Sequence, residues 1–151
     1  MAQSLAQIYL HIVCSTKNRK PFLQNAHFRK RLHKFLAKTC NNLESPCLEA
    51  GGVEDHVHVL CRLSKTMSPS DLIKELKRVS SAWVKTELSG LNDFYWQNGY
   101  GAFSISPSHV EALRKYIVNQ EQHHRRESFQ DEFRRLLRKY KIEFDERYVW
   151  D

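Results

Sequence analysis

The sequence predicts an α+β fold of the ferredoxin-like (RRM-like) type. This is a βαββαβ sandwich whose antiparallel sheet carries helices on one face, here with extra C-terminal helices. Short β-branched and aromatic runs alternate with longer segments whose apolar residues recur at helical spacing. Their order is strand, helix, strand, strand, helix, strand, which is the split arrangement of this fold. Further helical segments follow the last strand.

Residues 8–52 supply the first strand, the first helix and the second strand. Residues 8–15 are β-branched and aromatic, as in a buried strand. Asn25 is a candidate N-cap for a helix whose apolar positions run from Phe28 to Leu43. Residues 46–52 predict a second strand that ends at a glycine pair.

The second half of the sandwich repeats this order. Residues 56–63 predict a third strand. In it, Val57, Val59 and Cys61 alternate with His56, His58 and Leu60. Ser68, Pro69 and Asp71 have the spacing of an N-cap, a first helical position and a capping box, so a long helix begins there. Residues 94–105 contain two short, aromatic, strand-like pieces.

Two helices are predicted beyond the last strand. One opens with the capping-box pair Ser108 and Glu111 and runs to about residue 125. The other begins near Ser128 and carries apolar side chains on one side, and residues 144–151 form an acidic, aromatic tail.

Composition and charge narrow the class of protein. The chain has 151 residues, 41% of them hydrophobic and 27% charged, so we expect one domain spanning residues 1–151. No apolar run is long enough for a membrane span, and no secretory signal is visible. The four cysteines lack C-x-x-C spacing, which favours reduced thiols and a cytoplasmic protein. The net charge of +7 points to a polyanionic partner, with nucleic acid ahead of a membrane surface.

His56-Val57-His58 is a candidate metal-binding motif in the predicted third strand. Side chains two residues apart on a strand point to the same face, so two imidazoles can converge on one ion. Asp55 could orient one imidazole or could be a turn residue. On this pattern alone, surface or hydrogen-bonded histidines are the more frequent alternative.

The predicted third helix carries a second polar group. Tyr116, Gln120 and His123 follow one another at i, i+4 and i+7, at the margin of an apolar stripe. This spacing places them beside a cleft rather than inside the core. A half-buried tyrosine with polar neighbours is the ordinary alternative.

Taken together, these two groups resemble the single-tyrosine HUH transposases, a family of small insertion-sequence and REP-associated enzymes that act on single-stranded DNA. His56-Val57-His58 and Tyr116-x-x-x-Gln120 fit the order and spacing of the family's two motifs. Further stretches resemble the family at residues 11–19, 52–60, 96–104, 119–124 and 128–133.

The resemblance implies a mechanism. Tyr116 attacks the scissile phosphate, which forms a 5′-phosphotyrosine and frees a 3′-OH for later rejoining. His56, His58 and Gln120 hold a divalent metal, Mg²⁺ or Mn²⁺, that polarises the phosphate.

The resemblance also implies partners, namely single-stranded DNA with a hairpin and a second copy of the chain in a homodimer. We expect the DNA backbone to contact basic side chains in two segments. These are Lys17, Arg19 and Lys20 in the first segment, and Lys74, Lys77 and Arg78 in the second.

Three alternatives stay open at this point. In a hydrolase, His56, His58, His123 and His124 would bind zinc that activates water, and Tyr116 would be dispensable. A non-enzymatic nucleic-acid-binding module could share the fold, although its usual aromatic sheet signature is absent. A domesticated copy would nick particular DNA repeats rather than mobilise an element.

Overall fold

The sheet lies at the centre of the molecule and has the predicted topology. The computed structural model describes residues 2–88 and 90–151. Four antiparallel strands run in the order β2-β3-β1-β4, which is the order that the βαββαβ arrangement requires. The strands are β1 (Tyr9–Ser15), β2 (Cys47–Gly52), β3 (His56–Arg62) and β4 (Gly101–Ile105).

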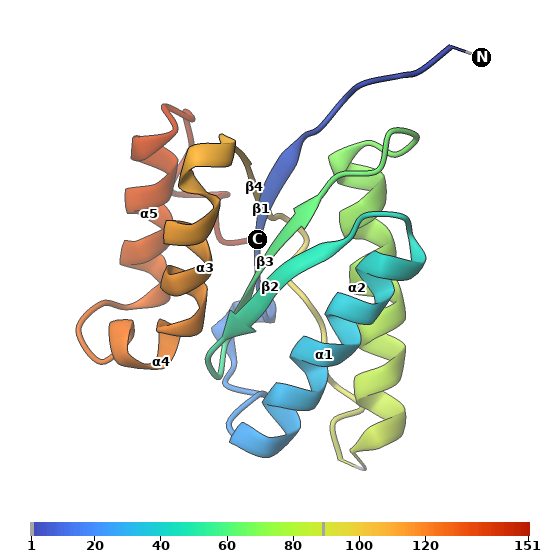
Figure 1. Ribbon diagram of the computed structural model, residues 1–151. Helices are drawn as coiled ribbons and strands as arrows, with labels where there is room; N and C mark the ends of the chain where they lie inside the picture. The colour runs from blue at the N-terminus through green and yellow to red at the C-terminus, as the bar shows by residue number, and fades with distance from the viewer. Residues whose placement is uncertain (1, 89) are drawn as a thin grey trace.

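Two long helices cover one face of the sheet (Figure 1). They are α1 (Ala26–Asn42) and α2 (Pro69–Glu87). The predicted caps are confirmed, because Asn25 accepts a hydrogen bond from the Phe28 amide and Ser68 accepts one from the Asp71 amide.

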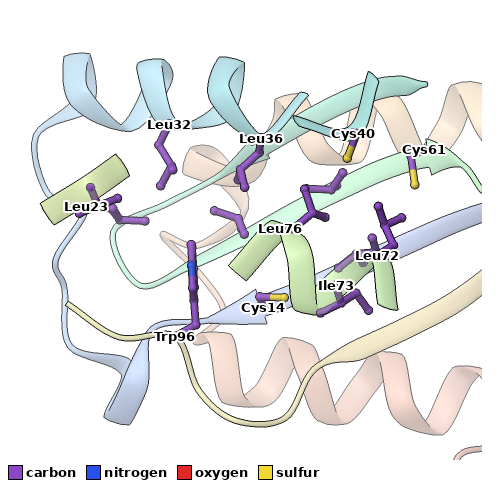
Figure 2. Close-up of a cluster of buried hydrophobic side chains, with 14 of the residues drawn as sticks. Cys14, Leu23, Leu32, Leu36, Cys40, Cys61, Leu72, Ile73, Leu76 and Trp96 are labelled. Carbon is purple, nitrogen blue, oxygen red and sulfur yellow. The ribbon is translucent and has the colours of Figure 1, made fainter. Parts of the chain in front are cut away.

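The larger hydrophobic core fills the space between these helices and the sheet (Figure 2). Alternate residues of β1 and β3 point into it, among them Ile12 and Val59, each 1% exposed. The cysteines are free, as expected, and Cys14, Cys40 and Cys61 are part of this core. The burial of these apolar side chains stabilises the sheet, and the opposite face of the sheet carries the candidate active site.

The second face of the sheet is covered as well, by α3 (Val110–Val118), α4 (Gln120–His123) and α5 (Phe129–Lys139) (Figure 1). These are the extra C-terminal helices that the sequence predicts, and they cover the face opposite α1 and α2. The covered face carries Val13, Leu60, Phe103 and Ile105, which are all buried. Apolar side chains on both faces of a sheet require a layer on each side.

The predicted third helix is divided in two. It breaks at Asn119, whose φ and ψ of −92° and 18° lie outside the helical range, so α3 ends there and the short α4 begins. The predicted capping box is not formed either. A short 3₁₀ turn, η2 (Pro107–His109), precedes α3, and the Ser108 hydroxyl lies near His109 Nδ1 instead of capping the helix. Ser128 lies at the predicted start of the last helix and caps α5 by accepting from the Asp131 amide.

Residues 94–105 contain one strand rather than two. β4 is the second of the predicted pieces, and the first forms only a single bridge between Trp96 and Thr16. No helix among the described residues is long and apolar enough to cross a membrane.

Candidate active site

His56 and His58 lie on β3 and point toward the second helical layer. Because strand side chains alternate, Val57 between them enters the hydrophobic core on the other face. Both imidazoles are fully buried. The sheet register places them beside the end of β1, where Ser15 pairs with His56 and Val13 with His58.

The break at Asn119 brings the second motif onto the histidines. Gln120 is buried at the start of α4, and its Oε1 lies 3.1 Å from His56 Nε2. Tyr116, on the last turn of α3, is half-buried, and its ring stands edge-on to His58 with centroids 5.9 Å apart. The structure therefore brings His56, His58, Tyr116 and Gln120 together within one chain.

Glu132, on α5, lies at the centre of this group and is fully buried. Its Oε1 is 3.1 Å from His58 Nε2 and 3.3 Å from His56 Nε2. Its Oε2 accepts a hydrogen bond from the Tyr116 hydroxyl and another, of 3.0 Å, from Gln120 Nε2. One carboxylate thus joins the tyrosine to both motif histidines.

His124 is the third imidazole beside Glu132. Its Nδ1 donates to the carbonyl oxygen of Glu127 at 2.6 Å, so Nε2 faces the site. That Nε2 is buried 3.1 Å from Glu132 Oε1, yet no described group gives it a hydrogen bond of acceptable geometry. A buried imidazole nitrogen beside a buried carboxylate oxygen fits a site that takes up a cation.

The donor set fits a divalent metal. His56, His58, His124 and Glu132 each offer one ligand atom, and these atoms all lie within 4.8 Å of one another. Imidazole nitrogens with a carboxylate oxygen suit Mn²⁺, Fe²⁺ or Zn²⁺ more than Ca²⁺. Gln120 Oε1 lies beside the same His56 nitrogen.

Neighbouring side chains orient the imidazoles. His56 Nδ1 lies 2.7 Å from Asp55 Oδ1, so its N–H donates to the carboxylate and Nε2 faces the site. His58 Nδ1 lies 2.8 Å from His11 Nε2 on β1. The orienting role considered for Asp55 thus agrees with its contact in the structure.

Burial and the neighbouring charges act in opposite directions on the pKa values of the site. Burial disfavours the charged form of His56, but its hydrogen bonds to Asp55 and Glu132 outweigh this and raise its pKa to about 9. Burial lowers the pKa of His58 despite the attraction of Glu132. Burial disfavours the charged form of Glu132, but the surrounding imidazoles outweigh this and hold the pKa of its carboxyl far below its usual range.

Tyr116 is held as a neutral phenol. Burial and the charge of Glu132 raise the pKa of its hydroxyl well above the ordinary value. Arg135 acts the other way, because its Nη2 donates to the Tyr116 oxygen at 2.9 Å. The site therefore supplies both an acceptor for the phenol proton and a donor for the negative oxygen that remains.

The first basic segment lies at the same end of the sheet as His56. Lys17 and Lys20 are exposed and Arg19 is partly exposed. Their turn is anchored by the Thr16 amide, which donates to the carbonyl oxygen of Asp55 at 2.8 Å.

The second basic segment is on α2, across the sheet from the histidines (Figure 1). Lys74 and Arg78 are exposed there. Lys77 is not available to DNA in this structure, because its ammonium donates to the carbonyl oxygens of Gln97, Asn98 and Gly99.

Sequence reasoning missed Glu132 and gave His11 no role. One signal for Glu132 was present, since it falls between Phe129 and Phe133 on the apolar side of its helix. A carboxylate on a buried face must have partners there. Nothing in the local pattern identified those partners.

Residues 4–120 match the family model described as transposase, IS200-like. The chain belongs to the IS200-like transposase family. The matched span includes His56, His58, Tyr116 and Gln120, whereas His124 and Glu132 lie beyond it. No curated protein matches this transposase significantly.

Two solved structures share the transposase fold. A candidate transposase from Deinococcus radiodurans superposes with a TM-score of 0.64 at 19% identity, covering 80% of this chain and 95% of that one. A REP-associated tyrosine transposase bound to a REP hairpin superposes with a TM-score of 0.57 at 15% identity, covering 82% and 74%. These similarities support the α+β fold and agree with the family assignment.

Proposed function

We propose that this transposase is a metal-dependent enzyme that cuts and rejoins single-stranded DNA through Tyr116. One observation carries the proposal. The Tyr116 hydroxyl donates to Glu132, and the same carboxylate contacts His56 and His58, so nucleophile and candidate metal ligands share one buried carboxylate.

In the proposed step, Tyr116 attacks the scissile phosphorus. A bond forms between its oxygen and phosphorus, and the bond from phosphorus to the 3′ oxygen breaks. The phenol proton passes to Glu132, the acceptor of its hydrogen bond, and the released 3′ oxygen takes up a proton to become a 3′-OH. Arg135 donates to the tyrosine oxygen and stabilises the charge that develops there. The 5′-phosphotyrosine keeps the bond energy for strand transfer or rejoining.

We assign the metal to His56, His58 and Gln120, as the family resemblance implies, with His124 and Glu132 beside them as further donors. A bound Mg²⁺ or Mn²⁺ would polarise the phosphate and offset its negative charge. Asp55 and His11 would keep the two strand imidazoles in place.

The DNA partner is proposed to be a single strand that carries a hairpin, and the REP-associated relative is itself bound to a REP hairpin. Lys17, Arg19 and Lys20 are the favoured contacts, because they lie at the end of the sheet where His56 begins β3. Lys74 and Arg78 would contact more distant backbone around the other face. A homodimer and a cytoplasmic location stay predictions. In this structure the Tyr116 ring stands edge-on to His58 of its own chain.

The test compares three proteins on single-stranded DNA that carries the element's own end hairpin, with Mn²⁺. They are the wild type, Tyr116→Phe and, as a matched control, Tyr148→Phe, whose ring is 63% exposed. We expect a covalent protein–DNA adduct on denaturing gels with the wild type and the control, and none with Tyr116→Phe or with EDTA.

Other outcomes separate the alternatives. Cleavage that survives Tyr116→Phe without an adduct would favour the water-activating metal hydrolase. Nicking without strand transfer would favour the domesticated nickase. Hairpin binding without any cleavage would favour a recognition module.

A further inference from the structure

A cavity of about 580 Å³ lies on the tyrosine side of the candidate active site. It is enclosed by the end of β4, by α3 and by α5, and the Tyr116 side chain forms part of its wall. The candidate metal ligands of the site do not line it.

The chemistry of the cavity suits a nucleotide. Ile105, Leu113 and Leu136 give it apolar surface, and the ring of Tyr140 is held by stacking on Phe103, with centroids 4.7 Å apart. A fixed aromatic ring and apolar walls are what a base needs in order to stack.

Polar groups of the cavity have the matching charge. Arg135 and Lys139 line it, and none of its lining residues is acidic. His11 also lines it, and the buried Nδ1 of His11 has no hydrogen-bond partner among the described residues. A basic, acid-free lining favours the phosphate backbone, and an unpartnered ring nitrogen can meet a base edge.

We propose that this cavity receives the nucleotide immediately 3′ of the scissile phosphate, the one that stays attached to Tyr116. The inference rests on the proposed function. In an in-line displacement the attacking and leaving oxygens lie on opposite sides of phosphorus. The 5′ strand therefore departs away from Tyr116, whereas the retained nucleotide lies beside the tyrosine, where the cavity opens.

The volume agrees with this occupant, because small-molecule pockets of roughly 300–1,000 Å³ enclose ligands of nucleotide size. The cavity also gives the enzyme a way to distinguish its cleavage site. A base that does not fit leaves the phosphate out of line with the Tyr116 oxygen.

The experiment uses the full chain and the hairpin oligonucleotide, with the cleavage point mapped from the free 3′-OH fragment. An abasic residue replaces either the nucleotide 3′ of the cut or the one 5′ of it. Affinity is measured by fluorescence anisotropy with Tyr116→Phe, which cannot cleave, and adduct formation is measured with the wild type. Base stacking of ~1–3 kcal/mol corresponds to a loss of about 5- to 150-fold for the 3′ abasic strand.

A filling variant tests the cavity itself. Ala112→Phe places a ring in the cavity, and Val118→Phe is the control on the same helix, at a position that is 65% exposed and does not line the cavity. We expect Ala112→Phe to weaken binding of the intact strand and to make it insensitive to the 3′ abasic change, with its melting temperature near that of the control.

Two results would overturn the inference. One is equal binding of the intact and 3′ abasic strands, or a larger loss for the 5′ abasic strand. The other is that the Ala112→Phe and abasic losses multiply, which would mean that they act at separate places. Failure of the proposed function gives a different result, because then the wild type forms no adduct with any strand.

Discussion

Replacing Glu132 with alanine is the sharpest perturbation that the structure offers. The change removes the acceptor of the Tyr116 hydroxyl and of the Gln120 amide, and it leaves the charged form of His56 without its second carboxylate. Breaking a buried charged pair by removing one partner costs ~3–5 kcal/mol. We therefore expect the free energy of unfolding at pH 7 to fall by about 4 kcal/mol. For a domain of this size that corresponds to a melting temperature lower by roughly 8–16 °C.

Urea unfolding followed by circular dichroism measures this loss. Glu127→Ala is the matched control, because its carboxylate is 23% exposed and pairs with His123 and Arg135 at 2.6 and 3.1 Å. Such a half-exposed pair contributes about 0–1 kcal/mol. If the free energies of unfolding of Glu132→Ala and Glu127→Ala differ by less than about 1 kcal/mol, Glu132 contributes no more than a partly exposed ion pair. The buried network would then not be what stabilises this layer.

The same pair of variants reports on the metal. A ligand that binds only the folded state at about 100 times its Kd adds ~2.7 kcal/mol of stability. We expect Mn²⁺ to stabilise the wild type and Glu127→Ala alike, and to stabilise Glu132→Ala clearly less. Equal stabilisation of all three would remove Glu132 from the metal site.

Three further predictions concern residues around the site. A Cβ on Gly51 would lie 2.8 Å from the carbonyl oxygen of Ile117, so Gly51→Ala must push α3 away from the sheet. We expect the free energy of unfolding in urea to fall by ~1–3 kcal/mol and adduct formation to be lost. An unchanged yield of adduct would contradict this. Burial, helped by Arg29, lowers the pKa of His33 to about 4, so the unfolded chain binds its proton more tightly. Stability should therefore hold above pH 6.5 and fall by up to about 3 kcal/mol as pH drops to 4, and His33→Gln should remove that part of the acid slope. Ser80→Ala leaves the buried Trp96 indole N–H without its 2.9 Å acceptor, so we expect the free energy of unfolding to fall by ~1–3 kcal/mol. An unchanged melting temperature would show that this hydrogen bond does not stabilise the fold.

The sheet and the first helical layer could be predicted because their signals are local. Alternation along residues 8–15 and 56–63 reports the strands, and side-chain caps at Asn25 and Ser68 report the helix starts. The break at Asn119 could not be predicted this way. Nothing in its neighbours stops a helix, and the turn is instead compatible with Gln120 reaching His56.

The sequence predicted the motif residues of the candidate site but not Glu132, which lies at its centre. His56 and His58 share a strand face, and Tyr116 and Gln120 share a helix face, so spacing alone pairs each couple. Glu132 is separated from His58 by 74 residues, and only the packing of α5 onto the sheet brings the two together. Long-range contacts of that kind leave no periodic trace in a sequence.

The position of Glu132 also explains why the second face of the sheet is closed. Three buried imidazoles and a tyrosine need a layer that excludes water and supplies one balancing charge. α5 does both, since Phe129 packs against the His56 ring with centroids 4.5 Å apart and Glu132 reaches the nitrogens. The family match ends at residue 120, before this helix. A chain shortened to the matched span would therefore keep all four motif residues but lose the carboxylate that joins them, so the completed site depends on the docking of α5.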